Sequence, residues 1–163
     1  MHLRLRPGGH HDSAGHVFLV GSSGGHLAQL QALEPWWSTR RRTWVTFQTP
    51  DAESVLADET VYWAYHPTTR NLWNLLRNLL VALRLILRER PDLVVSTGAG
   101  VALPFFVVAR AFGIPTAYIE VYDRMDTPTL TARLCHPFTT LFCAQWEEQQ
   151  RFYPDAKVIG ALL

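Results

Sequence analysis

The stretch that decides the fold is Val17-Phe18-Leu19-Val20-Gly21-Ser22-Ser23-Gly24-Gly25-His26-Leu27. Four apolar residues are too few for a helix and indicate a strand, and the glycine-rich turn after them leads to apolar positions three residues apart at Leu27, Leu30 and Leu33. This pattern predicts a strand, a turn and a helix. Glycine allows a ligand to come close to the backbone, and the first turn of a helix has unpaired N–H groups, so the corner favours an anion.

The motif itself leaves the identity of that anion open. The turn lacks the Lys-Ser/Thr ending of a nucleoside-triphosphate loop and the glycine spacing of a dinucleotide-binding loop. Ser22 and Ser23 can cap the helix or donate to a phosphate, and His26 falls in the first turn, where the neutral imidazole is favoured. The alternative interpretation is a tight turn that binds nothing, as any α/β protein can have.

Length and composition indicate one domain without a nucleic-acid partner. The chain has 163 residues and a formal net charge of +1, and no basic stripe is interleaved with aromatic residues. Cys135 and Cys143 suggest neither a zinc site nor a disulfide framework, so we expect buried thiols in a reducing compartment, with no metal and no cofactor. Residues 1–15 lack the apolar run of a signal peptide and are predicted to be a disordered tail before a single domain at 16–163. The histidines that cluster at this tail, without defined ligand geometry, are His2, His10, His11 and His16.

Strand and helix patterns alternate along the rest of the chain. The predicted strands are 17–20, 43–47, 61–65, 92–96, 116–119, 139–143 and 157–159, with helices or short helices between them. This alternation predicts an α/β fold, a doubly wound, Rossmann-like parallel sheet with right-handed crossovers. Arg40-Arg41-Arg42, before the second strand, is interpreted as a solvated turn, with contact to anionic lipid or a partner as the alternative.

The longest apolar segment, residues 71–87, is predicted to be a helix with an excess of apolar surface. Four arginines recur along it and, with Asn74 and Asn78, are expected to form one polar stripe. These charges argue against a membrane-spanning helix and favour an interfacial one, although a deeply buried crossover helix is also compatible. The residues expected to contact an anionic membrane surface are Arg70, Trp73, Arg77, Leu80, Arg84 and Arg88.

A second glycine turn, Thr97-Gly98-Ala99-Gly100, follows the fourth predicted strand, and Glu120 follows the fifth. Ligands of open parallel sheets collect beyond the carboxyl ends of the strands. We therefore expect the two glycine turns and Glu120 to converge on one site, with Tyr122, Asp123 and Arg124 behind Glu120.

Several segments from Val17 through Leu163 resemble one family in their order and content. They are Gly21 to Leu27, Ser96 to Pro104, Tyr118-Ile119-Glu120, Pro137-Phe138, Gln145-Trp146-Glu147-Glu148 and Tyr153-Pro154. The chain resembles the PssD-type polysaccharide-biosynthesis glycosyltransferases of bacteria. These are relatives of the eukaryotic subunit that anchors the dolichol-linked N-acetylglucosamine transferase to the membrane. Those eukaryotic relatives carry an amino-terminal membrane-spanning helix, whereas the tail here is polar, so we expect attachment through the helix of residues 70–90 or through a partner.

This resemblance implies the amino-terminal half of a GT-B glycosyltransferase whose nucleotide-sugar half is a separate protein. It implies a polyprenyl-pyrophosphate-linked saccharide as acceptor, a cytoplasmic membrane face as location and capsule or exopolysaccharide synthesis as context. The residues implied to bind the acceptor pyrophosphate are Gly21, Ser22, Ser23, Gly24, Gly25, Thr97, Gly98, Ala99 and Gly100. Either Glu120 or His26 would take the proton of the acceptor hydroxyl, the carboxylate being favoured if the site is polar.

Two other functions are open at this point. The chain can be a non-catalytic recruiter that brings the lipid substrate to a catalytic partner, or a free-standing nucleotide-binding module. A pure recruiter keeps its turnover when Glu120 or His26 is replaced, and a nucleotide-binding module has affinity for a soluble nucleotide.

Overall fold

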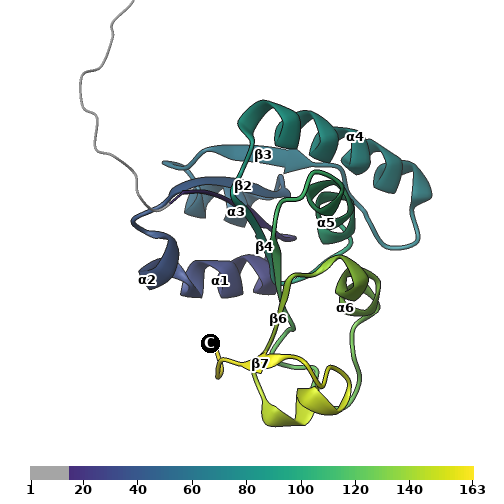
Figure 1. The fold of residues 1–163 in the computed structure, drawn as a ribbon. Helices are drawn as coiled ribbons and strands as arrows, with labels where there is room; N and C mark the ends of the chain where they lie inside the picture. The colour runs from purple at the N-terminus through teal and green to yellow at the C-terminus, as the bar shows by residue number, and fades with distance from the viewer. Residues whose placement is uncertain (1–14) are drawn as a thin grey trace, which may run out of the picture.

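Within residues 15–163, which the computed structural model describes, seven parallel strands form one sheet in the order β3-β2-β1-β4-β5-β6-β7 (Figure 1). The chain runs outward from β1 through β2 to β3 on one side and from β4 through β5 and β6 to β7 on the other. The doubly wound sheet is therefore confirmed. The strands are β1 (His16–Val20), β2 (Arg41–Phe47), β3 (Val61–Ala64), β4 (Leu93–Ser96), β5 (Thr116–Ile119), β6 (Leu141–Ala144) and β7 (Lys157–Val158).

Helices cover both faces of the sheet, so the central strands are apolar on both sides (Figure 1). One layer consists of α1 (Gly25–Ala32), α2 (Glu34–Trp37) and α3 (Pro50–Val55), and the other of α4 (Leu72–Glu89), α5 (Ala102–Ala111) and α6 (Leu130–Cys135). Two short 3₁₀ helices, η1 (His136–Phe138) and η2 (Glu147–Arg151), complete the structure. Alternate residues of β1 explain its unbroken apolar run, because Phe18 and Val20 pack with the α4–α6 layer and Val17 and Leu19 with the α1–α3 layer.

The interior of α4 differs from the expected polar stripe. Asn74 and Asn78 are buried, because Asn78 exchanges two hydrogen bonds of 2.9 Å with the backbone of Tyr65 and Asn74 donates to the Pro67 carbonyl. The two asparagines bind the segment that leads into the helix, so the predicted polar stripe is divided between these buried amides and the exposed arginines. Arg70 also lies outside the helix, which begins at Leu72 after the N-cap Asn71.

The described start of the chain corrects the assignment of His16. The predicted tail falls outside the described residues except for Gly15, and so do His2, His10 and His11. His16, however, is the first residue of β1 and only 6% exposed, so it does not belong to a solvated tail.

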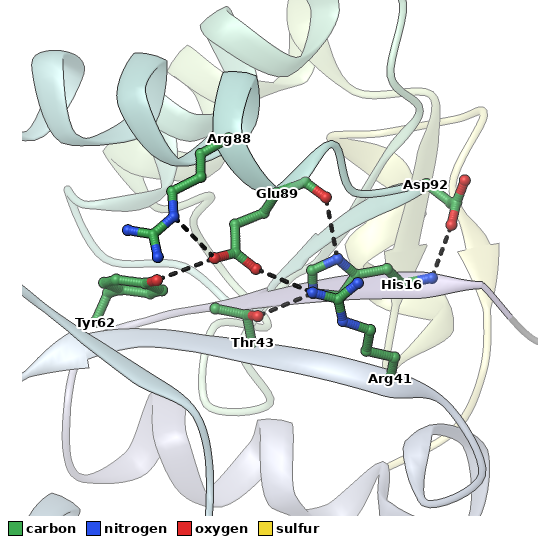
Figure 2. Close-up of polar contacts among 7 residues, drawn as sticks. All are labelled: His16, Arg41, Thr43, Tyr62, Arg88, Glu89 and Asp92. Carbon is green, nitrogen blue, oxygen red and sulfur yellow. Dashed lines mark hydrogen bonds and ion pairs between the residues drawn. The ribbon is translucent and has the colours of Figure 1, made fainter. Parts of the chain in front are cut away.

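A polar cluster surrounds the buried His16 at the amino ends of the strands (Figure 2). Its Nε2 lies 2.9 Å from Thr43 Oγ1, and its backbone N–H donates to the Asp92 carboxylate at 2.7 Å. Glu89, at the end of α4, accepts a hydrogen bond from the Tyr62 hydroxyl at 3.0 Å and pairs with Arg41 at 3.5 Å. The cluster therefore joins the end of α4 to β1, β2 and β3.

Of the three arginines predicted to form a turn before β2, only Arg40 precedes the strand. Arg41 and Arg42 belong to β2 itself. Arg42 pairs with Glu59 at 2.6 Å, and its guanidinium lies 4.5 Å above the Trp37 ring. The interpretation of the whole run as a solvated turn was therefore wrong for Arg42.

Candidate functional site

The two glycine turns meet at the point where the winding of the sheet reverses. β1 and β4 are neighbours, with Val20 opposite both Val45 and Ser96, yet the chain continues from them toward opposite edges. The carboxyl ends of two such strands form the crevice in which open α/β sheets bind ligands. The turn at 21–24 follows β1 and the turn at 97–100 follows β4, so the expected convergence of these turns is observed.

Two hydrogen bonds lock the turns together through His26 and Thr97. The Thr97 hydroxyl donates to the His26 carbonyl at 2.8 Å, and His26 Nδ1 lies 2.9 Å from the Thr97 carbonyl. Because a carbonyl can only accept, Nδ1 carries the proton, and the neutral ring has its lone pair on Nε2. No hydrogen-bond partner of Nε2 is found among residues 15–163, so this nitrogen can accept a proton.

The protonation of His26 is set mainly by burial. Desolvation lowers the pKa of His26 below its ordinary value of 6.5, while the bond to the Thr97 carbonyl and the charge of Asp123 oppose that shift. The ring is therefore neutral at pH 7. A neutral imidazole with one nitrogen fixed by a backbone carbonyl has the form of a general base.

His26 borders a pocket of about 340 Å³. The first three amides of α1 have no partner within the helix, so they can bind an anion next to the base, and the charges of Asp123 and Arg124 in the lining offset each other. The lining residues are Gly25, His26, Gln29, Val121, Tyr122, Asp123, Arg124 and Thr129.

Glycine is required for different structural reasons in the two turns. A Cβ on Gly24 or Gly25 would meet nothing within 4 Å, so this turn is open to a ligand. A Cβ on Gly98 would come within 2.9 Å of the His26 ring and of the Tyr118 hydroxyl, and one on Gly100 within 2.8 Å of Thr68 Cβ. In the second turn, glycine therefore allows segments of the chain itself to pack closely.

The serines of the first turn do not cap α1. Its N-cap is Gly24, with φ 71° and no side-chain hydrogen bond, and Ser22 Oγ instead donates to the Ser23 carbonyl at 3.2 Å. The capping interpretation was therefore wrong. The Gly24 amide donates to the Asp51 carboxylate at 3.3 Å, which shows that this turn accommodates a negative oxygen.

Glu120 lies behind the pocket. The residue is 1% exposed, and its carboxylate accepts hydrogen bonds from the Val121 amide at 3.0 Å and from the Thr129 amide and hydroxyl at 3.3 and 3.1 Å. Burial raises the pKa of Glu120, and these bonds oppose the shift. Because Thr129 is the N-cap of α6, Glu120 fixes both ends of the loop that forms the outer wall of the pocket.

Three buried glutamines support the same wall. Gln145 donates to Gln29 at 2.6 Å and to the Glu120 carbonyl at 3.0 Å, and Gln149 donates to the carbonyls of Val121 and Arg124 at 2.8 and 3.2 Å. Sequence reasoning missed Gln29 and Thr129 as pocket residues. The position of Gln29, three residues after His26 on one helix face, was the available signal.

The outer face of α4 carries an exposed apolar surface. At about 3.6 residues per turn, six apolar side chains project within an arc of about 100°, and Arg77, Arg84 and Arg88 follow along one edge of it. The interpretation of this segment as a deeply buried crossover helix is therefore wrong for its outer face. None of the helices in residues 15–163 is long and apolar enough to cross a membrane. The six side chains, 38–75% exposed, are Leu72, Trp73, Leu76, Leu80, Leu83 and Leu87.

Comparison with known proteins relates the chain to lipid-linked sugar transferases. Residues 64–162 match the family model described as "Oligosaccharide biosynthesis protein Alg14 like". The mouse UDP-N-acetylglucosamine transferase subunit ALG14 is 29% identical over 85 residues, 48% of this chain and 39% of that protein. An N-acetylglucosamine transferase of Geobacillus kaustophilus, named for a pyrophosphoryl-undecaprenol acceptor, is 30% identical over 87 residues, 53% of this chain and 24% of that protein.

Solved structures show the same fold. Acinetobacter baumannii MurG matches 82% of this chain and 42% of its own length with a TM-score of 0.68 at 20% identity. UDP-N-acetylglucosamine 2-epimerase from Rickettsia bellii matches 84% of this chain and 40% of its own with a TM-score of 0.67 at 12% identity. The sheet resembles the amino-terminal half of GT-B enzymes such as MurG, and the matched part is less than half of each of these relatives.

Proposed function

Because the chain belongs to the Alg14-like family of oligosaccharide-biosynthesis proteins, we propose that it is the acceptor-binding part of a glycosyltransferase. The donor is a nucleotide-sugar, such as a UDP-sugar, and the acceptor is a saccharide linked to polyprenyl pyrophosphate. The mouse relative's name supports a subunit role, and the Geobacillus relative's name supports the pyrophosphoryl lipid. PssD-type synthesis of a capsule or exopolysaccharide is the cellular context that we propose.

The observation that carries this proposal is the pocket beside His26. Its helix start suits a pyrophosphate, and the lone pair on His26 Nε2 suits the proton of an acceptor hydroxyl. We assign the base to His26 because Glu120 is enclosed by its bonds to Val121 and Thr129. Glu120 positions the loop that carries Asp123 and Arg124.

In the proposed reaction, the acceptor hydroxyl attacks the anomeric carbon of the donor sugar. The C–O bond to that carbon forms as the bond to the nucleotide diphosphate breaks, and His26 Nε2 takes the hydroxyl proton. The pyrophosphate of the acceptor stays at the open turn, Gly24 and Gly25, and at the first amides of α1. The donor is supplied by a separate nucleotide-sugar-binding subunit, which docks over the pocket.

The exposed face of α4 supports peripheral attachment to the cytoplasmic face of the membrane. Arg77, Arg84 and Arg88 lie beside the apolar arc that contains Trp73 and Leu80, as in helices that lie in a membrane interface. Arg70 precedes the helix and adds a further positive charge at its start.

The decisive experiment is reconstitution with a nucleotide-sugar-binding partner, a UDP-sugar and a polyprenyl-pyrophosphate saccharide. We expect transfer only when both chains are present, and a loss of about 100-fold or more in turnover for His26→Gln in the intact complex. If His26→Gln keeps full turnover per complex, the chain is a recruiter and its partner does the chemistry. If the isolated chain binds a soluble nucleotide, the nucleotide-binding alternative is favoured.

A further inference from the structure

A second and larger hollow, of about 560 Å³, lies beside the second glycine turn. Its walls come from the loop before α4, the first turn of α4, α5 and α6, and its volume is in the usual range of small-molecule sites. We call it the leucine groove. Its lining residues are Thr68, Thr69, Arg70, Asn71, Leu72, Leu75, Gly100, Leu103, Leu130, Thr131 and Leu134.

The leucine groove is apolar and open to solvent. Leu72, Leu130 and Leu134 are 75%, 70% and 46% exposed, so the groove leaves large apolar side chains in water. Its lining includes one charged side chain, Arg70, and no acidic one among the described residues. A ligand that suits this lining is an apolar chain whose charged end is an anion.

The leucine groove and the His26 pocket are adjacent. Thr129 lines the pocket, and the next two residues, Leu130 and Thr131, line the groove. Gly98 packs against the His26 ring, and Gly100, two residues later, borders the groove. The groove lining also includes Leu72, which belongs to the exposed apolar face of α4.

We propose that the leucine groove binds the isoprene units nearest the pyrophosphate of the lipid acceptor. This inference rests on the proposed function. The chain enters along the apolar face of α4, passes between Leu72 and Leu130 and delivers its pyrophosphate past Gly100 to the amides of α1 beside His26. Arg70, the one charged side chain among the described residues of the groove lining, favours an anionic amphiphile over a cationic one. An amphiphile held in this way keeps its apolar chain out of water while its sugar reaches the base.

Chain length tests this proposal in solution, without a bilayer or a partner. The probes are inorganic pyrophosphate, dimethylallyl pyrophosphate and farnesyl pyrophosphate, titrated by calorimetry into the full chain at constant salt. We expect farnesyl pyrophosphate to bind at least about tenfold more tightly than dimethylallyl pyrophosphate, because each methylene taken out of water favours binding. Equal affinities for the three probes, or no binding by any of them, would overturn the proposal.

A pair of substitutions separates the leucine groove from the apolar face of α4. Leu130→Gln with Leu134→Gln changes two exposed positions of the groove without changing charge, and Gln is nearly as good a helix former as Leu. The matched control is Leu76→Gln with Leu80→Gln, which are 54% and 68% exposed and lie outside the groove. Unchanged melting temperatures establish that both variants are folded.

We expect the groove pair to remove the advantage of farnesyl pyrophosphate while leaving dimethylallyl pyrophosphate affinity within about twofold. The control pair should keep that advantage and lose binding to anionic vesicles instead. If the control pair rather than the groove pair loses the advantage, the isoprenoid lies on α4 and the proposal is wrong. Failure of the proposed function can be distinguished from failure of this proposal. In that case farnesyl pyrophosphate still binds, but the reconstituted complex transfers no sugar.

Discussion

Gly25 gives the sharpest test of the pocket at the scale of one residue. A Cβ there meets nothing within 4 Å, and Gly25 is the first residue of α1, where alanine is a better helix former than glycine. We expect Gly25→Ala to leave the free energy of unfolding unchanged or raised and to lower transfer about tenfold or more, because the methyl blocks the approach of phosphate to the backbone. Denaturant unfolding and transfer assays with the partner measure the two effects. Full activity in this variant would show that the turn does not bind the acceptor.

The pH dependence of transfer tests His26 as the base. Since burial lowers the pKa of His26, kcat/KM should fall on acidification only below about pH 6.5, where the ring becomes protonated. Asp123→Asn removes a charge that raises this pKa, so the acid limb should move to still lower pH. An acid limb that does not move in Asp123→Asn would mean that a different group titrates.

Sequence reasoning found His26 but not the state of Glu120. The place of His26 follows from local spacing, since the first turn after a glycine corner faces the crevice. The enclosure of Glu120 depends on Thr129, which is brought back by the loop 121–128, and no local pattern encodes that return. The spacing of Gln29 from His26 placed it on the same helix face, but its bond to Gln145, 116 residues away, could not be predicted from that spacing.

At the scale of one element, α4 makes a testable prediction about membranes. Reversing Arg77 and Arg84 to Glu should weaken binding to anionic vesicles by about tenfold or more, at roughly 1 kcal/mol for each charge near the surface. Flotation at increasing salt measures the effect, and Arg110→Glu with Lys157→Glu is a control with the same change in net charge on exposed residues of α5 and β7. Equal binding by the two variants would show that the arginine edge does not face the bilayer.

The length and apolar excess of α4 could be predicted from its sequence, but not the roles of its asparagines. Helical periodicity gave both the arginine edge and the apolar arc. Asn74 and Asn78 are polar by composition, yet they are buried because the chain before α4 turns back and offers the backbone groups of Tyr65 and Pro67. A helix pattern contains no information about such a partner.

For the whole molecule, the cluster around His16 predicts that acid destabilises the fold. Desolvation lowers the pKa of His16 below 6.5, the value of the exposed group. As the pH falls through about 6.5, the unfolded chain takes up a proton that the folded chain resists, so the free energy of unfolding should decrease until the folded pKa is passed. His16→Gln should remove part of this dependence, and His26 contributes in the same direction.

Urea unfolding of wild type and His16→Gln at several pH values between 5 and 8 measures this effect. A wild-type stability that does not change over this interval would contradict the assignment of His16 as a buried neutral residue.

The topology itself was predictable, because alternating strand and helix patterns leave few arrangements of a parallel sheet. The joining of α4 to three strands through Glu89 was not, since it depends on residues that are far apart in sequence.

The paired hydrogen bonds between His26 and Thr97 also constrain the order in which the molecule matures. His26 leaves the ribosome 71 residues before Thr97 does. Until β4 docks beside β1, the imidazole is in water and either of its nitrogens can carry the proton. The bond to Thr97 then selects the tautomer at the same time as it closes the central strands. The chain therefore acquires its proposed base through a long-range folding step. A nascent chain that ends before β4 contains His26 but does not fix the tautomer in which Nε2 accepts a proton.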